Sequence, residues 1–274
     1  QAAAAAAAAS TTRTAATSST TAEAQRGTVY GGGSEEPPPH GAANGRPMRA
    51  LQRLRIGSHV ITESDMGKLR VSASGTGMLL GRDRQEKPVI VRFFRPEPTR
   101  ATSVGGIWLA RLVAFRALAL GARIVLFTSR PAAWERFGRW ATGRDDRVAV
   151  MPQERPVAVE ASAAVPALLI YDVGLLGASA RPVLGPWQTQ LTVLNQLTAY
   201  GFPAVQESNL VAMQRLSGDE AFAAASVLRL TGETPQLLQV LRDDMIALIG
   251  GGADRYVWTQ PSDIERSQFG APTR

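Results

Sequence analysis

The feature that most constrains the fold is a series of short, almost uninterrupted apolar runs that begins near the middle of the chain. Two of them read RIVLFT at 123–128 and ALLIY at 167–171. Strands that are apolar on both faces are typical of a parallel sheet that helices cover from both sides. We therefore predict an α/β fold, with a mostly parallel sheet and helices on both faces, preceded by a β-hairpin.

Helical periodicity and turn residues divide the remaining sequence into further elements. The strands 77–81 and 89–94 flank a polar turn and are predicted to form the hairpin. The other predicted strands are 55–62, 69–73, 100–104, 147–151, 204–206 and 255–259. The predicted helices are 107–120, 131–140, 186–200, one that follows the capping box at Ser217, and 235–249.

The N-terminal part of the chain has a different composition. Residues 1–47 are rich in Ala, Ser, Thr, Gly and Pro. Such a tract buries too little apolar surface to offset the entropy lost on folding, so we expect a flexible linker. Residues 48–270 are predicted to form a single α/β domain, whose hairpin subregion covers about 54–95. The sequence begins at Gln1, so the possibility of an upstream segment that associates with a membrane stays open.

The composition excludes several classes of site. The 274 residues contain no cysteine, which excludes disulfides, thiolate metal sites and a cysteine nucleophile. The two histidines are His40 and His59, and His40 lies in the proline-rich tract, so we expect no metal centre. Of the 30 basic residues, only Lys68 and Lys87 are lysines, and the net charge is +7. This excess favours an anionic partner.

Gly105 and Gly106 join a predicted strand to a predicted helix in the segment SVGGIWLAR. A turn that leads into a helix N-terminus presents free N–H groups to a phosphate. A working phosphate loop reads G-x-x-x-x-G-K-[ST], in which the lysine contacts the β- and γ-phosphates. Here that lysine is missing, and Ile107 and Trp108 would fill the phosphate position; we expect Trp108 to be buried. Two interpretations stay open, a tight packing turn and a degenerate nucleotide-binding turn.

The apolar run at 167–171 ends in Asp172. The segment LLIYD matches a Walker-B strand, whose aspartate positions Mg²⁺ at the C-terminal end of a parallel strand. The next residue is Val173, rather than the glutamate that activates water. The alternative is that Asp172 caps a turn at Gly174.

Arginines recur from Arg82 to Arg147. Two interpretations are open for them. They form solvated faces, with Arg111 and Arg116 extending from a buried helix, or they form a surface for nucleic acid or an acidic protein. The aromatic residues in WERFGRW are spaced as in a helix core more than as in a stacking platform.

The order of these elements resembles that of FtsK/SpoIIIE-type P-loop ATPase domains, in particular those of actinobacterial type VII (ESX) secretion systems. The resemblance covers about residues 75–260. It rests on the hairpin GMLLGRDRQEKPVIVRFF, the strand–Gly-Gly–helix, the strands RIVLFT and LLIYD, and the late strand RYVWT. It implies a P-loop NTPase-like sheet with Gly105 and Gly106 at the phosphate loop and Asp172 as the Walker-B aspartate. The lysine of that loop has no counterpart.

The resemblance and the missing lysine together set the functional expectation. We expect a non-catalytic, P-loop-like interaction domain that is a component or accessory of a type VII secretion machine. We expect it in the cytoplasm or at the inner face of the cell membrane. Its expected partners are proteins of the secretion complex. We expect no cofactor. The alternatives are a nucleic-acid-binding, translocase-like protein and an ATPase that uses ATP and Mg²⁺ with a nonstandard loop.

Overall fold

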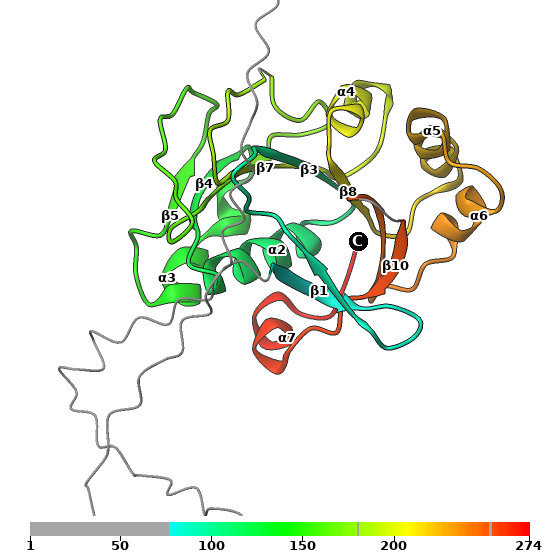
Figure 1. Cartoon of the computed structure of the whole chain (residues 1–274), viewed down its shortest axis with the longest axis horizontal. Helices are drawn as coiled ribbons and strands as arrows, with labels where there is room; N and C mark the ends of the chain where they lie inside the picture. Colours follow the sequence, from blue (N-terminus) through cyan, green and yellow to red (C-terminus); the bar gives the residue numbers. More distant parts are fainter. Residues whose placement is uncertain (1–76, 180, 252–253) are drawn as a thin grey trace, which may run out of the picture. The chain divides into compact units, whose positions relative to one another are not determined.

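The computed structural model describes residues 77–179, 181–251 and 254–274 (Figure 1). The predicted linker at 1–47 and the predicted strands 55–62 and 69–73 lie outside the described residues. The start of the predicted domain at residue 48 lies outside them as well.

The described residues form one mixed sheet of ten strands, in the order β2-β1-β10-β9-β8-β3-β7-β6-β4-β5. The strands from β8 to β5 in this order all pair in parallel. This parallel part consists of β3 (Thr99–Val104), β4 (Arg123–Thr128), β5 (Val148–Met151), β6 (Ala167–Asp172), β7 (Gln188–Leu194) and β8 (Leu210–Met213). The predicted α/β class with a mostly parallel sheet is confirmed.

The other part of the sheet is antiparallel and includes the predicted hairpin. β1 (Met78–Arg82) pairs with β2 (Pro88–Val91) across the polar turn, and β9 (Met245–Gly250) pairs with β10 (Arg255–Trp258). β9 joins this part to β8, and the hairpin meets β10 through the pair Arg82–Trp258.

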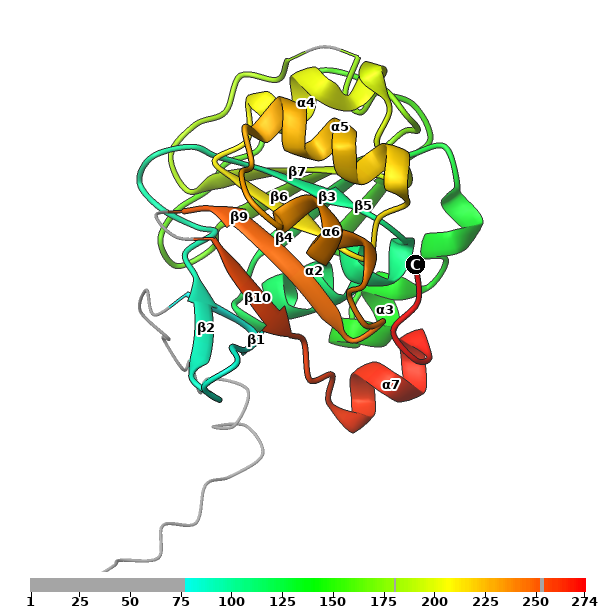
Figure 2. The ribbon, with the colours of Figure 1, turned by 90° about the vertical axis from the view of Figure 1, so that its right-hand side faces the viewer.

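Helices cover both faces of the sheet (Figures 1 and 2). One face packs against α2 (Ile107–Ala119), α3 (Phe137–Thr142) and α7 (Asp263–Phe269). The other packs against α4 (Phe202–Gln206), α5 (Gly218–Leu228) and α6 (Thr234–Gln239). α2 is apolar on nearly every side because it lies between the sheet and further elements, and its Trp108, Leu109, Leu112 and Val113 are all buried.

Several short sequence motifs predicted the correct helix or strand. The capping box at Ser217 opens α5, with Ser217 Oγ accepting from Glu220 N–H and the Glu220 carboxylate accepting from Ser217 N–H. Gly121 ends α2 with φ of 83°, in the left-handed region that favours glycine. The predicted strands 100–104, 123–128, 147–151, 167–171 and 255–259 are also confirmed within a residue or two.

The predicted helix at 186–200 is wrong. Its centre is β7, the strand between β3 and β6 in the middle of the sheet. Leu191 and Leu194 have a spacing that a helix would share, but the β-branched residues around them favour a strand. The polar side chains have hydrogen-bond partners: Thr189 Oγ1 donates at 2.6 Å to the backbone O of Phe93, which follows β2, and Gln190 Nε2 donates to Thr192 Oγ1 at 3.1 Å.

Three further predictions need correction. The predicted strand at 204–206 belongs to helix α4, and the predicted helix at 235–249 divides into α6 and β9. Buried apolar residues of α6 and β9, such as Leu238 and Leu248, have spacings that also fit one continuous helix. The predicted helix at 131–140 divides into the 3₁₀ helix η1 (Pro131–Trp134) and α3. Strand β8 and helix α7 were not predicted.

The described part of the chain contains no helix that is both long enough and apolar enough to cross a membrane.

Candidate functional site

The three residues singled out from the sequence lie along one edge of the parallel sheet. Gly105 directly follows β3, Gly106 is the N-cap of α2, and Asp172 is the last residue of β6. Because the strands are parallel, their carboxyl ends meet at this edge. β7 separates β3 from β6, and Gly105 N–H donates to Leu194 O of β7 at 2.8 Å.

The Gly105–Gly106 turn is in contact with the side chain of Gln214. Gln214 Oε1 accepts from Gly106 N–H at 2.7 Å, so the amide that would meet a phosphate already has a partner. Gly105 has φ of 143°, and a Cβ on it would lie only 2.5 Å from the same Gln214 oxygen. Glycine is therefore required here by backbone conformation and by the close approach of Gln214.

Residues 270–274, which we call the strap, cover the N-terminus of α2. Gln214 Nε2 donates to Thr273 O at 3.0 Å, and a Cβ on Gly106 would lie 2.8 Å from the backbone of Arg274. Trp108 Nε1 donates to Gly270 O at 3.2 Å, and Trp108 is 2% exposed, which confirms its predicted burial. The space beyond the helix N-terminus is thus filled by protein backbone.

A buried carboxylate anchors the strap. The Arg274 guanidinium forms an ion pair with Glu220 and donates to Arg215 O. Burial raises the pKa of Glu220, but the hydrogen bonds from Arg274 and from the backbone N–H groups of Ser217 and Leu197 outweigh it, so this pKa lies below its usual range. The strap is therefore held by a charged group that also belongs to the capping box of α5.

Asp172 is fully buried and its two carboxylate oxygens are occupied. Oδ2 accepts from Thr128 Oγ1 at 3.1 Å and from Trp134 Nε1 at 3.0 Å, while Oδ1 pairs with the Arg130 guanidinium. Arg130 also donates to Asn195 Oδ1 at 3.1 Å. The carboxylate therefore holds the loop after β4, rather than capping a turn at Gly174 as one interpretation had it.

The structure brings Gly105, Gly106 and Asp172 to one edge of the sheet, where each makes hydrogen bonds within the protein. Sequence reasoning missed these partners, namely Gln214, the strap and Arg130. Gln214 lies 108 residues from Gly106, and no local pattern marks such a contact. Within the described ranges, no group of three or more His, Asp or Glu side chains is placed to hold a metal ion.

Comparison with known proteins finds no matching family model and no matching curated protein. Among solved structures, VirB4 of Thermoanaerobacter pseudethanolicus is similar with a TM-score of 0.48 and 10% identity, over 70% of this chain and 98% of that chain. The cytoplasmic domain of the Thermomonospora curvata type VII secretion ATPase EccC has a TM-score of 0.43 and 12% identity, over 72% of this chain and 28% of that one.

ATPases 2 and 3 of EssC from Geobacillus thermodenitrificans also have a TM-score of 0.43 and 12% identity, over 70% of this chain and 42% of that one.

Proposed function

We propose that this chain is a P-loop-like interaction domain that does not hydrolyse ATP and that works within a bacterial type VII secretion machine. One observation carries the non-catalytic part of the proposal. The turn between β3 and α2, where a phosphate loop would bind its ligand, is occupied by Gln214 and the strap.

The chemistry of the turn supports the same conclusion. Catalysis of phosphoryl transfer needs a cation on the β- and γ-phosphates and a free carboxylate for Mg²⁺. The loop sequence has no lysine, and Lys87, which the structure places at the hairpin turn, belongs to a different part of the sheet. The Asp172 carboxylate accepts from three side chains, so Mg²⁺ would have to displace Thr128, Arg130 or Trp134.

The secretion setting is the part of the proposal that rests on the sequence resemblance. It gives the domain protein partners in a secretion complex and a place in the cytoplasm or at the inner face of the membrane. The expected lack of a cofactor rests instead on the missing lysine of the loop. A nucleic-acid surface is less well supported for three arginines of the predicted array, which have partners within the protein: Arg116 pairs with Glu265, Arg130 with Asp172, and Arg100 donates to Pro182 O.

A turnover assay on the full chain tests the non-catalytic part. We expect phosphate release from Mg²⁺–ATP at the same background level for wild type, for Asp172→Asn and for Asp146→Asn. Asp146 is a matched control because it is an exposed aspartate in an ion pair with Arg144. Turnover that is clear in wild type, lost in Asp172→Asn and kept in Asp146→Asn would show that the chain is an ATPase.

A further inference from the structure

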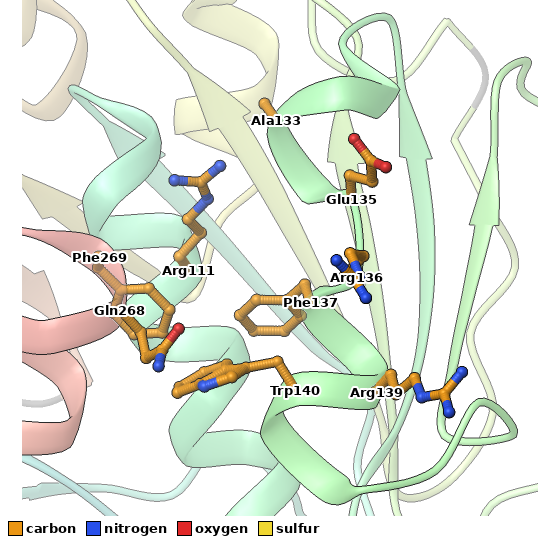
Figure 3. Close-up of a pocket in the computed structure, with 9 residues that line it drawn as sticks. All are labelled: Arg111, Ala133, Glu135, Arg136, Phe137, Arg139, Trp140, Gln268 and Phe269. Atoms are coloured by element: carbon orange, nitrogen blue, oxygen red, sulfur yellow. The ribbon is translucent and has the colours of Figure 1, made fainter.

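A cavity of about 450 Å³ lies between α2, α3 and α7, where η1 leads into α3 (Figure 3). Its volume lies in the range of small-ligand clefts, and it is open to solvent on the side of the exposed Glu135, Arg136 and Arg139. Neither Gly105, Gly106 nor Asp172 lines it. The side chains that do are Arg111, Ala133, Glu135, Arg136, Phe137, Arg139, Trp140, Gln268 and Phe269.

Aromatic rings form the apolar wall of this cavity. Phe137 and Phe269 stack with their centroids 6.1 Å apart, and Trp140 meets Phe269 edge-on at 5.5 Å. Trp140 and Phe269 are half-buried. Phe115 stacks on Trp140 at 5.1 Å from behind the lining, which fixes the indole. Such a wall suits a flat ring, because aromatic pairs gain from stacked and edge-on contacts.

Three arginines also line the cavity, namely Arg111, Arg136 and Arg139. In Figure 3, Arg111 and Arg136 lie on either side of the Phe137 ring, and Arg139 extends away from it. Within the part of the chain that the structure describes, the guanidinium groups of Arg111 and Arg136 make no hydrogen bond or ion pair, and Arg139 lies 4.0 Å from Asp145. Glu135 is the one acidic side chain among the lining residues. The lining therefore carries more positive than negative charge.

The environment of Arg111 disfavours an isolated cation. Burial lowers the pKa of Arg111, the nearby Arg130 guanidinium lowers it further, and Asp172 offsets part of this effect. Asp172 is itself already paired with Arg130. An anion in the cavity would compensate the charge of Arg111.

Arg136 stands in an unusual backbone conformation. Its φ of 58° and ψ of 2° are left-handed, and it is the residue at which η1 gives way to α3. For a residue with a β-carbon this conformation costs on the order of 1–3 kcal/mol, and such positions cluster at ligand sites. The conformation interrupts the predicted continuous helix and places the Arg136 side chain on the lining of the cavity.

We propose that this cavity binds a small organic anion that carries a flat ring. The ring packs on Phe137 and Trp140, and the anionic group, a phosphate or a carboxylate, pairs with Arg111 and Arg136. The proposal is independent of the proposed function, because it concerns a site beside α2 and not the turn at its N-terminus.

Calorimetric titration of the full chain tests the proposal with four probes. AMP carries a ring and a phosphate, adenosine only the ring, ribose 5-phosphate only the phosphate, and indole-3-acetate a ring and a carboxylate. We expect AMP or indole-3-acetate to bind about tenfold more tightly than both partial probes, since each half of the site contributes. Tighter binding of AMP identifies a phosphate ligand, and tighter binding of indole-3-acetate a carboxylate. No binding of either up to about 10 mM would overturn the proposal.

Matched variants locate the binding. Arg111→Gln and the exposed Arg136→Gln should each weaken the better probe by about tenfold, because each removes a charge-assisted hydrogen bond. Arg84→Gln, which removes the same charge from the hairpin turn, should leave the affinity unchanged. Equal affinity in all variants would refute the site. Binding that responds to Gln214→Ala and not to Arg136→Gln would place the ligand at the N-terminus of α2 and refute it as well.

Discussion

The ion pair between Arg116 and Glu265 offers a sharp test of what holds α7 to the domain. Arg116 Nε and Nη2 donate to the two Glu265 oxygens at 2.8 and 3.0 Å. The remaining guanidinium protons go to three backbone carbonyls, those of Leu79, Leu80 and Thr259. The two side chains are only 16% and 5% exposed. One arginine thus connects α2, the hairpin, the end of β10 and α7.

Glu265→Ala removes the counter-ion and leaves the Arg116 charge buried. Breaking a buried pair from one side costs about 3–5 kcal/mol. The same carboxylate accepts from Ser262 N–H at 2.7 Å in the capping box of α7, so the variant also loses this cap. Since a domain is stable by about 5–15 kcal/mol, the loss is a large share of the total.

Urea unfolding followed by circular dichroism measures this loss as a lower midpoint at an unchanged slope. Asp263→Ala is the matched control, because Asp263 lies in the same helix and its pair with Arg266 is exposed. We expect no measurable change for it. A loss for Glu265→Ala below about 1 kcal/mol would refute the reasoning from burial.

The same pair predicts a pH dependence. Burial raises the pKa of Glu265, but the hydrogen bonds from Arg116 and Ser262 and the charge of Arg116 outweigh it, so the folded-state pKa lies below its usual range. A depressed carboxyl pKa stabilises the fold above the unfolded value of about 4.3, and this contribution is lost as the pH falls through the folded value. The stability gap between wild type and Glu265→Gln should therefore narrow below about pH 4. A gap that stays constant from neutral pH to pH 3 would contradict this.

Three other substitutions probe the edge of the sheet and the caps. Trp108→Ala should cost about 3–5 kcal/mol in urea unfolding, because the ring is fully enclosed; a loss under about 1 kcal/mol would mean that the cavity collapses freely. Asp172→Ala should cost about 2–4 kcal/mol, because it leaves Trp134 Nε1 and Arg130 without their acceptor, and a neutral result would assign no structural role to the carboxylate. Ser217→Ala should cost about 1 kcal/mol through the lost α5 cap, and an unchanged midpoint would speak against that cap.

Sequence reasoning succeeded where a segment's own residues decide its structure. The strands β4 and β6 each contain an unbroken apolar run, at 124–127 and 167–171, and are flanked by turns, so their type followed from the pattern alone. Segment 188–194 failed because its alternating Gln and Thr are buried in the centre of the sheet, where the pattern of a half-exposed element does not apply. Its type depends on β3 and β6, which lie far away in sequence.

The candidate site shows the same division. Gly105, Gly106 and Asp172 could be placed at one edge, because parallel strands bring their carboxyl ends together. The groups that occupy them could not be predicted. The strap reaches Trp108 from 162 residues away, and Gln214 is an ordinary residue after a short strand. Only the assembled fold shows that the turn is covered.

The position of β3 has a consequence for how fast the chain reaches its native state. β3 is the first parallel strand in the sequence, yet its two neighbours are β7 and β8, and the Arg100–Gln190 contact closes a loop of 90 residues. Closing such loops costs entropy before any pairing compensates it, which slows folding of non-local sheets. The hairpin of β1 and β2 closes locally and can form within microseconds. Until β7 inserts, β3 and β6 each have at least one unpaired edge, and unpaired strand edges make a folding intermediate prone to aggregate.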